Sequence, residues 1–305
     1  MSDFFGERLA QAVRKTGNCA VVGLDPHLDR FPASMRERFE GRSGNAYRKE
    51  AAKAVVDFNR MVIETVSDLV PAVKPQFAFY EALGSHGFAA LEETCAAARE
   101  AGLLVLGDAK RGDIASTAAA YARSILDPSG PFHCDAVTVN PWMGADTLEP
   151  FLDACTETGG GMFVLVRTTN PGSRWLQHHG SPTAAIQVAE VLHQRGRAMT
   201  GPSGLSSLGA VVGAMTGDEA TRLRTAMPNA WFLVPGVGAQ GGSTRDALAG
   251  QRPDRMGCVV NSSRGVLFPS AAHSERYEDA PGEVIREMAK THAERFQLDV
   301  LTAIQ

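Results

Sequence analysis

The chain has 305 residues, of which 44% are hydrophobic and 21% charged, and its formal net charge is −4. This length and composition are typical of a globular protein with a sizeable core, in one large domain or two small ones. The weak negative charge gives no overall reason to expect a nucleic-acid partner or an anionic membrane, so any anionic ligand must be captured by a local site.

The cysteines and the N-terminal segment indicate the compartment. Five cysteines are scattered along the chain without a Cys-x-x-Cys pair, which predicts reduced thiols and neither a disulfide framework nor a zinc site. Residues 1–15 are amphipathic and lack the apolar centre of a signal peptide, and no run of 18 apolar residues occurs. We therefore expect a cytoplasmic protein with no membrane partner.

Short apolar runs alternate with helical patterns along the whole chain. Residues 1–18 are predicted to form an N-terminal helix, and residues 270–305 a C-terminal helix centred on 282–297. The runs of strand length lie at residues 19–25, 69–74, 103–108, 135–140, 162–167, 208–215, 231–236 and 257–262. Helical spacing of apolar residues lies between them, at residues 44–68, 86–101, 114–125 and 183–199.

This repetition predicts the fold. Continuously apolar strands separated by helices are typical of a parallel sheet that is buried on both faces. Eight β/α units in a chain of this length favour a closed barrel over an open, doubly wound sheet. No linker or break in composition occurs, so residues 1–305 are expected to form one domain. The predicted class is α/β, a single (β/α)8 TIM barrel with extra N-terminal and C-terminal helices.

Polar residues collect where the predicted strands end. In a parallel barrel these ends form one mouth, which is where catalytic groups lie. The residues concerned are Asp25, Lys74, Asp108, Asn140, Arg167, Gly236 and Ser262.

The third predicted strand ends in a charged sequence, Asp108-Ala109-Lys110. Side chains at positions i and i+2 of a strand share a face, so Asp108 and Lys110 should point the same way. A carboxylate beside an ammonium keeps both groups ionised, which suits a lysine that holds a proton until a carbanion forms. The alternative is a solvated turn with an incidental ion pair.

The two loops that follow the last strands fit a phosphate site. Residues 236–242, Gly-Val-Gly-Ala-Gln-Gly-Gly, offer bare backbone amides, and residues 262–265, Ser-Ser-Arg-Gly, offer a guanidinium. The first loop also matches the dinucleotide motif G-x-G-x-x-G, but the only acidic residue near the required distance, Asp254, comes too early and a single strand remains. A glycine turn without a ligand is the remaining alternative.

Other polar segments carry weaker signals. Residues 168–172, Thr-Thr-Asn-Pro-Gly, follow the fifth strand and could read the edge of a polar ring or simply form a turn. His178 and His179 have no acidic neighbour in the sequence, which favours a solvated loop over a metal site. No serine lies in G-x-S-x-G and no cysteine has an obvious base, so nucleophilic catalysis lacks support.

These motifs together resemble one enzyme family. The segment 108–117, Asp-Ala-Lys-Arg-Gly-Asp-Ile-Ala-Ser-Thr, is similar to the D-x-K-x-x-D-I-x-x-T signature of orotidine 5′-phosphate decarboxylase. Five further segments resemble the longer bacterial (type 2) branch of that family, in the same order along residues 19–268. They are residues 73–81, 140–144, 166–172, 235–242 and 262–265.

The resemblance implies a decarboxylation of orotidine 5′-monophosphate without metal or cofactor. Lys110 would donate the proton to C6 of the pyrimidine, and Asp108 would lie against the substrate carboxylate. Lys74 and Asp113 would complete an alternating Lys-Asp-Lys-Asp array. The carbanion has no electron sink, so fixed charge must favour it over the carboxylate.

The resemblance also implies the substrate contacts and a homodimer with shared sites. Asp113 and Thr117 would reach into the site of the partner subunit. Asp25 would bind ribose hydroxyls, Thr169 rather than Thr168 would read the pyrimidine, and Gln240 and Arg264 would hold the phosphate. The full predicted substrate-binding set is Asp25, Thr117, Asn140, Thr169, Gly238, Gln240, Gly241 and Arg264.

Two alternatives remain open. Magnesium-dependent sugar-phosphate decarboxylases and aldolases on the same barrel carry a similar D-x-K-x-x-D segment, but Lys74 places a cation where a metal site would need an acid. A non-catalytic barrel that binds nucleotide phosphates is the second alternative, although such a protein does not need a lysine beside two aspartates.

Overall fold

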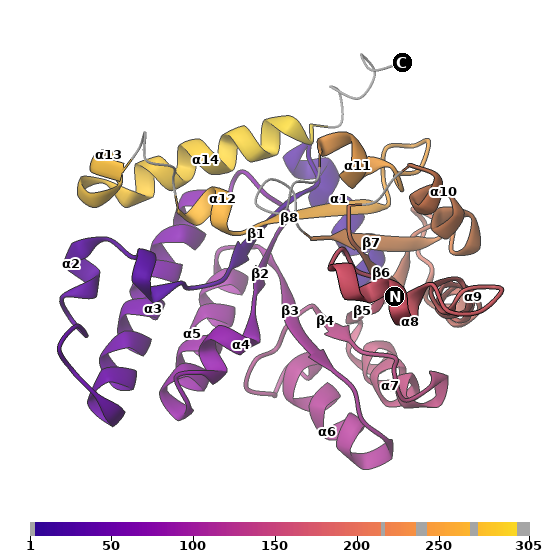
Figure 1. The fold of residues 1–305 in the computed structure, drawn as a ribbon, viewed down its shortest axis with the longest axis horizontal. Coiled ribbons are helices and arrows are strands. Elements are labelled where there is room, and N and C mark those ends of the chain that lie inside the picture. Colours follow the sequence, from indigo (N-terminus) through magenta and orange to yellow (C-terminus); the bar gives the residue numbers. More distant parts are fainter. Residues whose placement is uncertain (1–3, 215–216, 236–242, 269–273, 298–305) are drawn as a thin grey trace.

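The computed structural model describes residues 4–214, 217–235, 243–268 and 274–297. Within them, eight parallel strands form one closed barrel in which each strand pairs with the next and β8 pairs with β1 (Figure 1). This confirms the predicted fold class. The strands are β1 (Ala20–Leu24), β2 (Ala72–Pro75), β3 (Leu104–Arg111), β4 (Ala136–Val139), β5 (Gly161–Arg167), β6 (Ser206–Val212), β7 (Ala230–Val234) and β8 (Cys258–Ser262).

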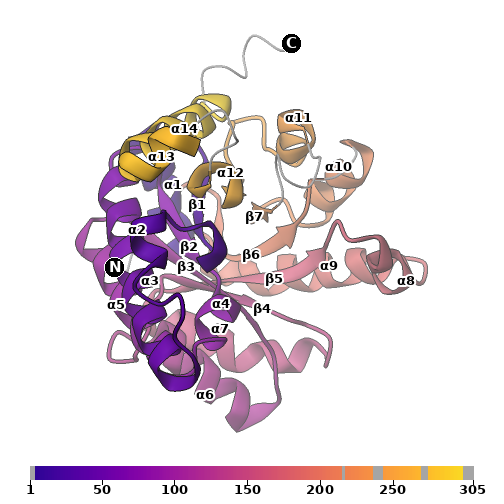
Figure 2. The same ribbon diagram turned by 60° about the vertical axis from the view of Figure 1, so that its left-hand side comes forward.

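Helices surround the barrel (Figures 1 and 2). The long ones are α1 (Phe5–Thr16), α3 (Gly44–Val66), α5 (Ser85–Glu100), α6 (Ala115–Leu126), α7 (Glu149–Thr158), α9 (Ala184–Gly196), α10 (Gly217–Ala226) and α14 (Pro281–Arg295). The short ones are α2 (Ala33–Arg36), α4 (Phe77–Glu81), α8 (Arg174–Gln177), α11 (Thr244–Leu248), α12 (Arg264–Leu267) and α13 (Ser274–Asp279). Single 3₁₀ turns cover Leu28–Arg30, Ala145–Leu148, Pro171–Ser173 and Arg197–Met199.

The third strand is longer than its apolar run suggests. The sequence predicts an end at Asp108, but β3 continues to Arg111, which pairs with Val139 after an irregularity in the register that begins at Gly107. The extension carries Lys110 on the strand itself. Apolar periodicity missed it because two of the three additional residues, Lys110 and Arg111, are charged, and Arg111 is held by its pairing with β4.

The N-terminal helix α1 closes the end of the barrel at which the strands begin. The backbone N–H of Gly6 donates to Ser207 Oγ over 3.1 Å, and the Trp231 indole donates to the Gly6 carbonyl over 3.1 Å. A Cβ atom at Gly6 would lie 2.6 Å from the backbone carbon of Ser206, so only glycine permits this approach. With this end sealed, the carboxyl ends of the strands form the open mouth.

The C-terminal helix α14 packs across α3 and β1 and buries His292 (Figure 1). The imidazole is 6% exposed, and its Nε2 lies 3.4 Å from the Val260 carbonyl of β8. Burial lowers the pKa of His292 to about 4, against an ordinary value of 6.5, because the charged form loses its hydration.

This burial predicts an acid sensitivity of the fold. Because the unfolded chain binds the His292 proton near pH 6.5 and the folded chain only near pH 4, the contribution of this residue to stability is complete above pH 6.5 and is lost as the pH falls through that window. The loss should approach about 3 kcal/mol. We expect denaturant unfolding of His292→Gln to depend less on pH over this range; an unchanged dependence would contradict the assignment.

Candidate active site

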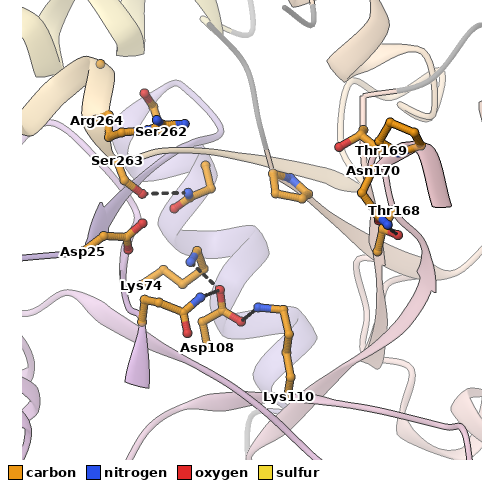
Figure 3. A pocket seen from close by; sticks show the side chains of 15 residues that line it. Asp25, Lys74, Asp108, Lys110, Thr168, Thr169, Asn170, Ser262, Ser263 and Arg264 are labelled. Atoms are coloured by element: carbon orange, nitrogen blue, oxygen red, sulfur yellow. Dashed lines mark hydrogen bonds and ion pairs between the residues drawn. The ribbon is translucent and has the colours of Figure 1, made fainter. Parts of the chain in front are cut away.

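A cavity of about 560 Å³ opens at the carboxyl ends of the strands (Figure 3). Its walls come from the ends of β1, β2, β3, β7 and β8 and from the segment after β5, as expected for the mouth of a parallel barrel. The lining residues are Asp25, Lys74, Gln76, Asp108, Lys110, Thr168, Thr169, Asn170, Pro171, Pro235, Asn261, Ser262, Ser263, Arg264 and Gly265.

The floor of the cavity is built around the Asp108 carboxylate, which is 7% exposed. Lys74 Nζ lies 2.7 Å from Oδ2, and Lys110 Nζ lies 2.5 Å from Oδ1. Gln76 Nε2 donates to Oδ2 over 2.8 Å, and Thr138 Oγ1 donates to Oδ1 over 3.0 Å. Each carboxylate oxygen therefore accepts hydrogen bonds from one charged and one neutral donor. Asp108 and Lys110 lie on the same side of β3, as the sequence predicted.

These contacts set the protonation states. Burial alone would raise the pKa of Asp108, but the ammonium groups of Lys74 and Lys110 outweigh it and hold that pKa well below the usual range. Burial likewise acts to lower the pKa of Lys74, whereas the charges of Asp108 and Asp25 raise it, with a net rise. The floor is therefore a stable arrangement of a carboxylate between two ammonium groups at neutral pH.

The backbone at Lys110 is unusual. Its φ angle is +47°, in the left-handed region that non-glycine residues rarely adopt, and it lies within the irregular part of β3. The Lys110 N–H donates to Thr138 Oγ1 over 2.9 Å, and the same hydroxyl donates to Asp108. This bulge directs Lys110 over Asp108, while the Lys110 side chain remains 44% exposed.

Sequence reasoning missed two partners of Asp108. Gln76 follows β2 directly, and Thr138 is the single polar residue of β4. A lone hydroxyl residue in an apolar parallel strand is a signal that could have identified Thr138, because a buried hydroxyl needs a partner.

The wall at the ends of β1 and β8 carries hydrogen-bond acceptors that have no donor among the described residues. Asp25 Oδ1 and Asn261 Oδ1 are buried and have no hydrogen-bond partner among the described residues, whereas Asn261 Nδ2 donates to Ser263 Oγ over 3.2 Å. Arg264 begins α12 and lies above Asp25 in the view of Figure 3. An open carboxylate oxygen below a guanidinium suits a ligand that carries both hydroxyl groups and an anion.

The third wall is the segment Thr168–Asn170, which faces Asp25 and Ser263 across the cavity in Figure 3. Arg167 was expected at the mouth but does not line the cavity: it is 5% exposed, and its Nε lies 2.7 Å from Glu219. His178 has no acidic neighbour in the sequence, but in the fold its Nε2 lies 2.9 Å from the same carboxylate. Glu219 lies far along the chain, so no local sequence pattern could show it.

Several predicted site residues lie elsewhere. Asp113 accepts from the Ile114 N–H over 2.7 Å, Thr117 is exposed on α6, and neither lines the cavity of a single chain. Asn140 accepts from the Trp142 N–H over 3.0 Å and lines a neighbouring cavity of about 470 Å³. Four residues of the predicted glycine loop, Gly236, Gly238, Gln240 and Gly241, lie outside the described residues.

Within the described residues, no helix has the length and hydrophobicity required to cross a bilayer. Among the same residues, no group of three or more His, Cys, Asp or Glu side chains lies close enough together to hold a metal ion.

The closed barrel and the charged cavity at the carboxyl ends of its strands are the arrangement typical of (β/α)8-barrel enzymes. Residues 22–270 match the orotidine 5′-phosphate decarboxylase / HUMPS family. The chain therefore belongs to that family, as its sequence motifs indicated.

Relatives and solved structures agree with this assignment. The chain is 40% identical over 290 residues to the orotidine 5′-phosphate decarboxylase of Rhodopirellula baltica, covering 90% of this chain and 94% of the relative. It is 45% identical over 258 residues to that of Deinococcus radiodurans, covering 84% and 85%. The structure of Leishmania donovani OMP decarboxylase is similar with a TM-score of 0.67 and 35% identity, covering 94% of this chain and 100% of the other.

The burial of Lys74 in the floor predicts that this lysine stabilises the fold. Replacing Lys74 by Met should leave the buried Asp108 carboxylate with one ammonium partner and lower the free energy of unfolding by about 3 kcal/mol. Lys53→Met is the matched control, because the Lys53 side chain is 53% exposed and pairs with Glu50 on the surface. Urea unfolding of both variants measures the difference; equal effects would show that the floor is not buried in solution.

Proposed function

We propose that this chain decarboxylates orotidine 5′-monophosphate to uridine 5′-monophosphate and CO₂ in pyrimidine synthesis, without a cofactor. The observation that carries the proposal is the Lys74–Asp108–Lys110 floor, found in a chain of this family and in a cavity whose far wall ends in Arg264. That cavity offers cationic groups at both ends, as a ligand with a carboxylate and a phosphate requires.

The floor supports the chemistry as follows. The bond between C6 and the carboxylate carbon breaks, CO₂ leaves, and the electron pair remains on C6. Lys110, whose Nζ pairs with Asp108, transfers its proton to C6 and is reprotonated from solvent through its exposed side. The fixed cations favour negative charge at C6 in the transition state, because they are already oriented and need no reorganisation.

The walls suggest how the substrate is oriented. The phosphate would lie at Arg264, with the predicted contacts Gly238, Gln240 and Gly241, and the ribose hydroxyls would meet the open oxygen of Asp25. The pyrimidine would lie between Lys110 and the Thr168–Asn170 wall. Thr169, which lines the cavity, is the predicted pyrimidine contact.

The direct test follows the ultraviolet absorbance of orotidine 5′-monophosphate with purified protein, with and without a strong chelator. We expect loss of the orotate chromophore at an equal rate in both. Turnover that needs magnesium, or activity only on sugar phosphates, would favour the magnesium-dependent relatives. Tight binding of nucleotide without turnover would indicate a binding protein.

The role of Lys110 can be tested separately from binding. Lys110→Ala should lower kcat by about 10³-fold or more because the proton donor is lost. Calorimetry should show uridine 5′-monophosphate binding within a few fold of the unmodified protein, since the other walls remain. Lys53→Ala on the surface is the control. Near-native turnover by Lys110→Ala would refute the mechanism.

We further propose a homodimer with shared active sites. Exposed apolar side chains follow β3 and β4: Ile114 is 60% exposed, Trp142 65% and Met143 47%. Such a patch favours an interface between subunits. A second subunit docked there would cover the segment that carries Asp113 and Thr117, which supports their predicted role in the partner's site. The scattered free cysteines also support a cytoplasmic location.

Mixed dimers test the sharing. Lys110→Ala and Asp113→Ala should each be inactive alone, but equal amounts refolded together should regain about a quarter of full activity, because half of the dimers are mixed and each has one intact site. A mixture as inactive as its parents would show that each site is built from one chain.

A further inference from the structure

A buried arginine lies behind the Thr168–Asn170 wall and takes no part in the chemistry described so far. Arg167 ends β5, is 5% exposed and does not line the cavity. Its Nη1 donates to the Thr168 carbonyl, to Ser173 Oγ over 2.6 Å and to Gln177 Oε1 over 3.2 Å. One guanidinium nitrogen thus contacts three groups of the segment that follows it. A buried cation of this kind costs hydration and needs a function or a structural reason.

Gln177 and Ser173 both form hydrogen bonds with Thr168, the first residue of the wall. Gln177 Oε1 accepts from the Thr168 N–H over 2.9 Å, and Gln177 Nε2 donates to Thr168 Oγ1 over 3.0 Å. Ser173 Oγ donates to the Thr168 carbonyl over 3.0 Å. The N–H, the hydroxyl and the carbonyl of Thr168 are therefore all bound. We call Arg167, Ser173 and Gln177 the clamp.

The clamp fixes a peptide plane. In a trans peptide the carbonyl of one residue and the N–H of the next point in opposite directions. Arg167 and Ser173, which donate to the Thr168 carbonyl, do not line the cavity, and the Thr169 N–H points in the direction opposite to that carbonyl. Rotation of this plane would break the hydrogen bonds of Arg167 and Ser173 together.

The clamp is anchored to the next β/α unit. Arg167 Nε lies 2.7 Å from Glu219 near the start of α10, and His178 Nε2 lies 2.9 Å from the same oxygen. The ion pair with Glu219 compensates the burial of the guanidinium and ties the segment after β5 to the unit that follows β6. The wall is thus positioned by two units of the barrel.

We propose that the clamp residues are positioning residues that hold the Thr168–Asn170 wall against the pyrimidine ring of the nucleotide. This inference rests on the proposed function for the identity of the ring. Loosening the clamp should therefore weaken binding of the base. It should leave binding of the sugar phosphate at Asp25 and Arg264 unchanged.

The test compares two ligands by calorimetry, uridine 5′-monophosphate, which has the ring, and ribose 5-phosphate, which lacks it. Gln177→Ala should bind the nucleotide about tenfold more weakly and ribose 5-phosphate within about twofold of the unmodified protein. Gln177→Glu keeps an acceptor for the Thr168 N–H and should restore most of the nucleotide affinity. Gln187→Ala is the matched control, because Gln187 is an exposed glutamine whose side-chain amide donates to the Pro182 carbonyl and does not contact Thr168.

Arg167→Lys provides the second variant, because it retains the charge beside Glu219 but not the fork that reaches Thr168, Ser173 and Gln177. Arg167→Lys should likewise lose affinity for uridine 5′-monophosphate and keep its affinity for ribose 5-phosphate. Equal losses for both ligands, or no loss for either, would overturn the proposal. Neither measurement requires turnover, so failure of the decarboxylation assay and failure of the clamp are distinguishable.

Discussion

The structure depends on the burial of one carboxylate between two ammonium groups. Asp108 can remain ionised at 7% exposure only because Lys74, Lys110, Gln76 and Thr138 supply a donor to each open position of its two oxygens. These donors come from three adjacent strands and the residue after β2, so their distances are set by the barrel. A change in strand register would leave a buried charge without a partner.

The two ends of the barrel differ, and the buried carboxylate lies toward the open one. The end at which the strands begin is sealed by α1, where Gly6 lies against the backbone of β6 and leaves no room for a side chain. The other end is open and carries the polar groups. Because parallel strands all finish at the same edge, groups far apart in sequence, such as Asp25 and Arg264, line one cavity without any local motif.

The two long walls of the cavity differ in how their polar groups are used. On one side, Asp25 and Asn261 retain buried oxygens that no described residue satisfies, which is a state suited to a ligand. On the other side, the N–H, the hydroxyl and the carbonyl of Thr168 are all bound by the clamp. The cavity therefore combines unpaired acceptors on one side with a hydrogen-bonded segment on the other.

The sequence by itself determined the eight strands, their parallel order and the pairing of Asp108 with Lys110, because apolar periodicity and spacing along one strand are local properties. It did not determine the extension of β3 through Lys110 with φ of +47°, the partners Gln76 and Thr138, or the withdrawal of Arg167 to Glu219. Those features depend on contacts between strands and between β/α units, which form only when the barrel closes and burial requires every charge to find a partner.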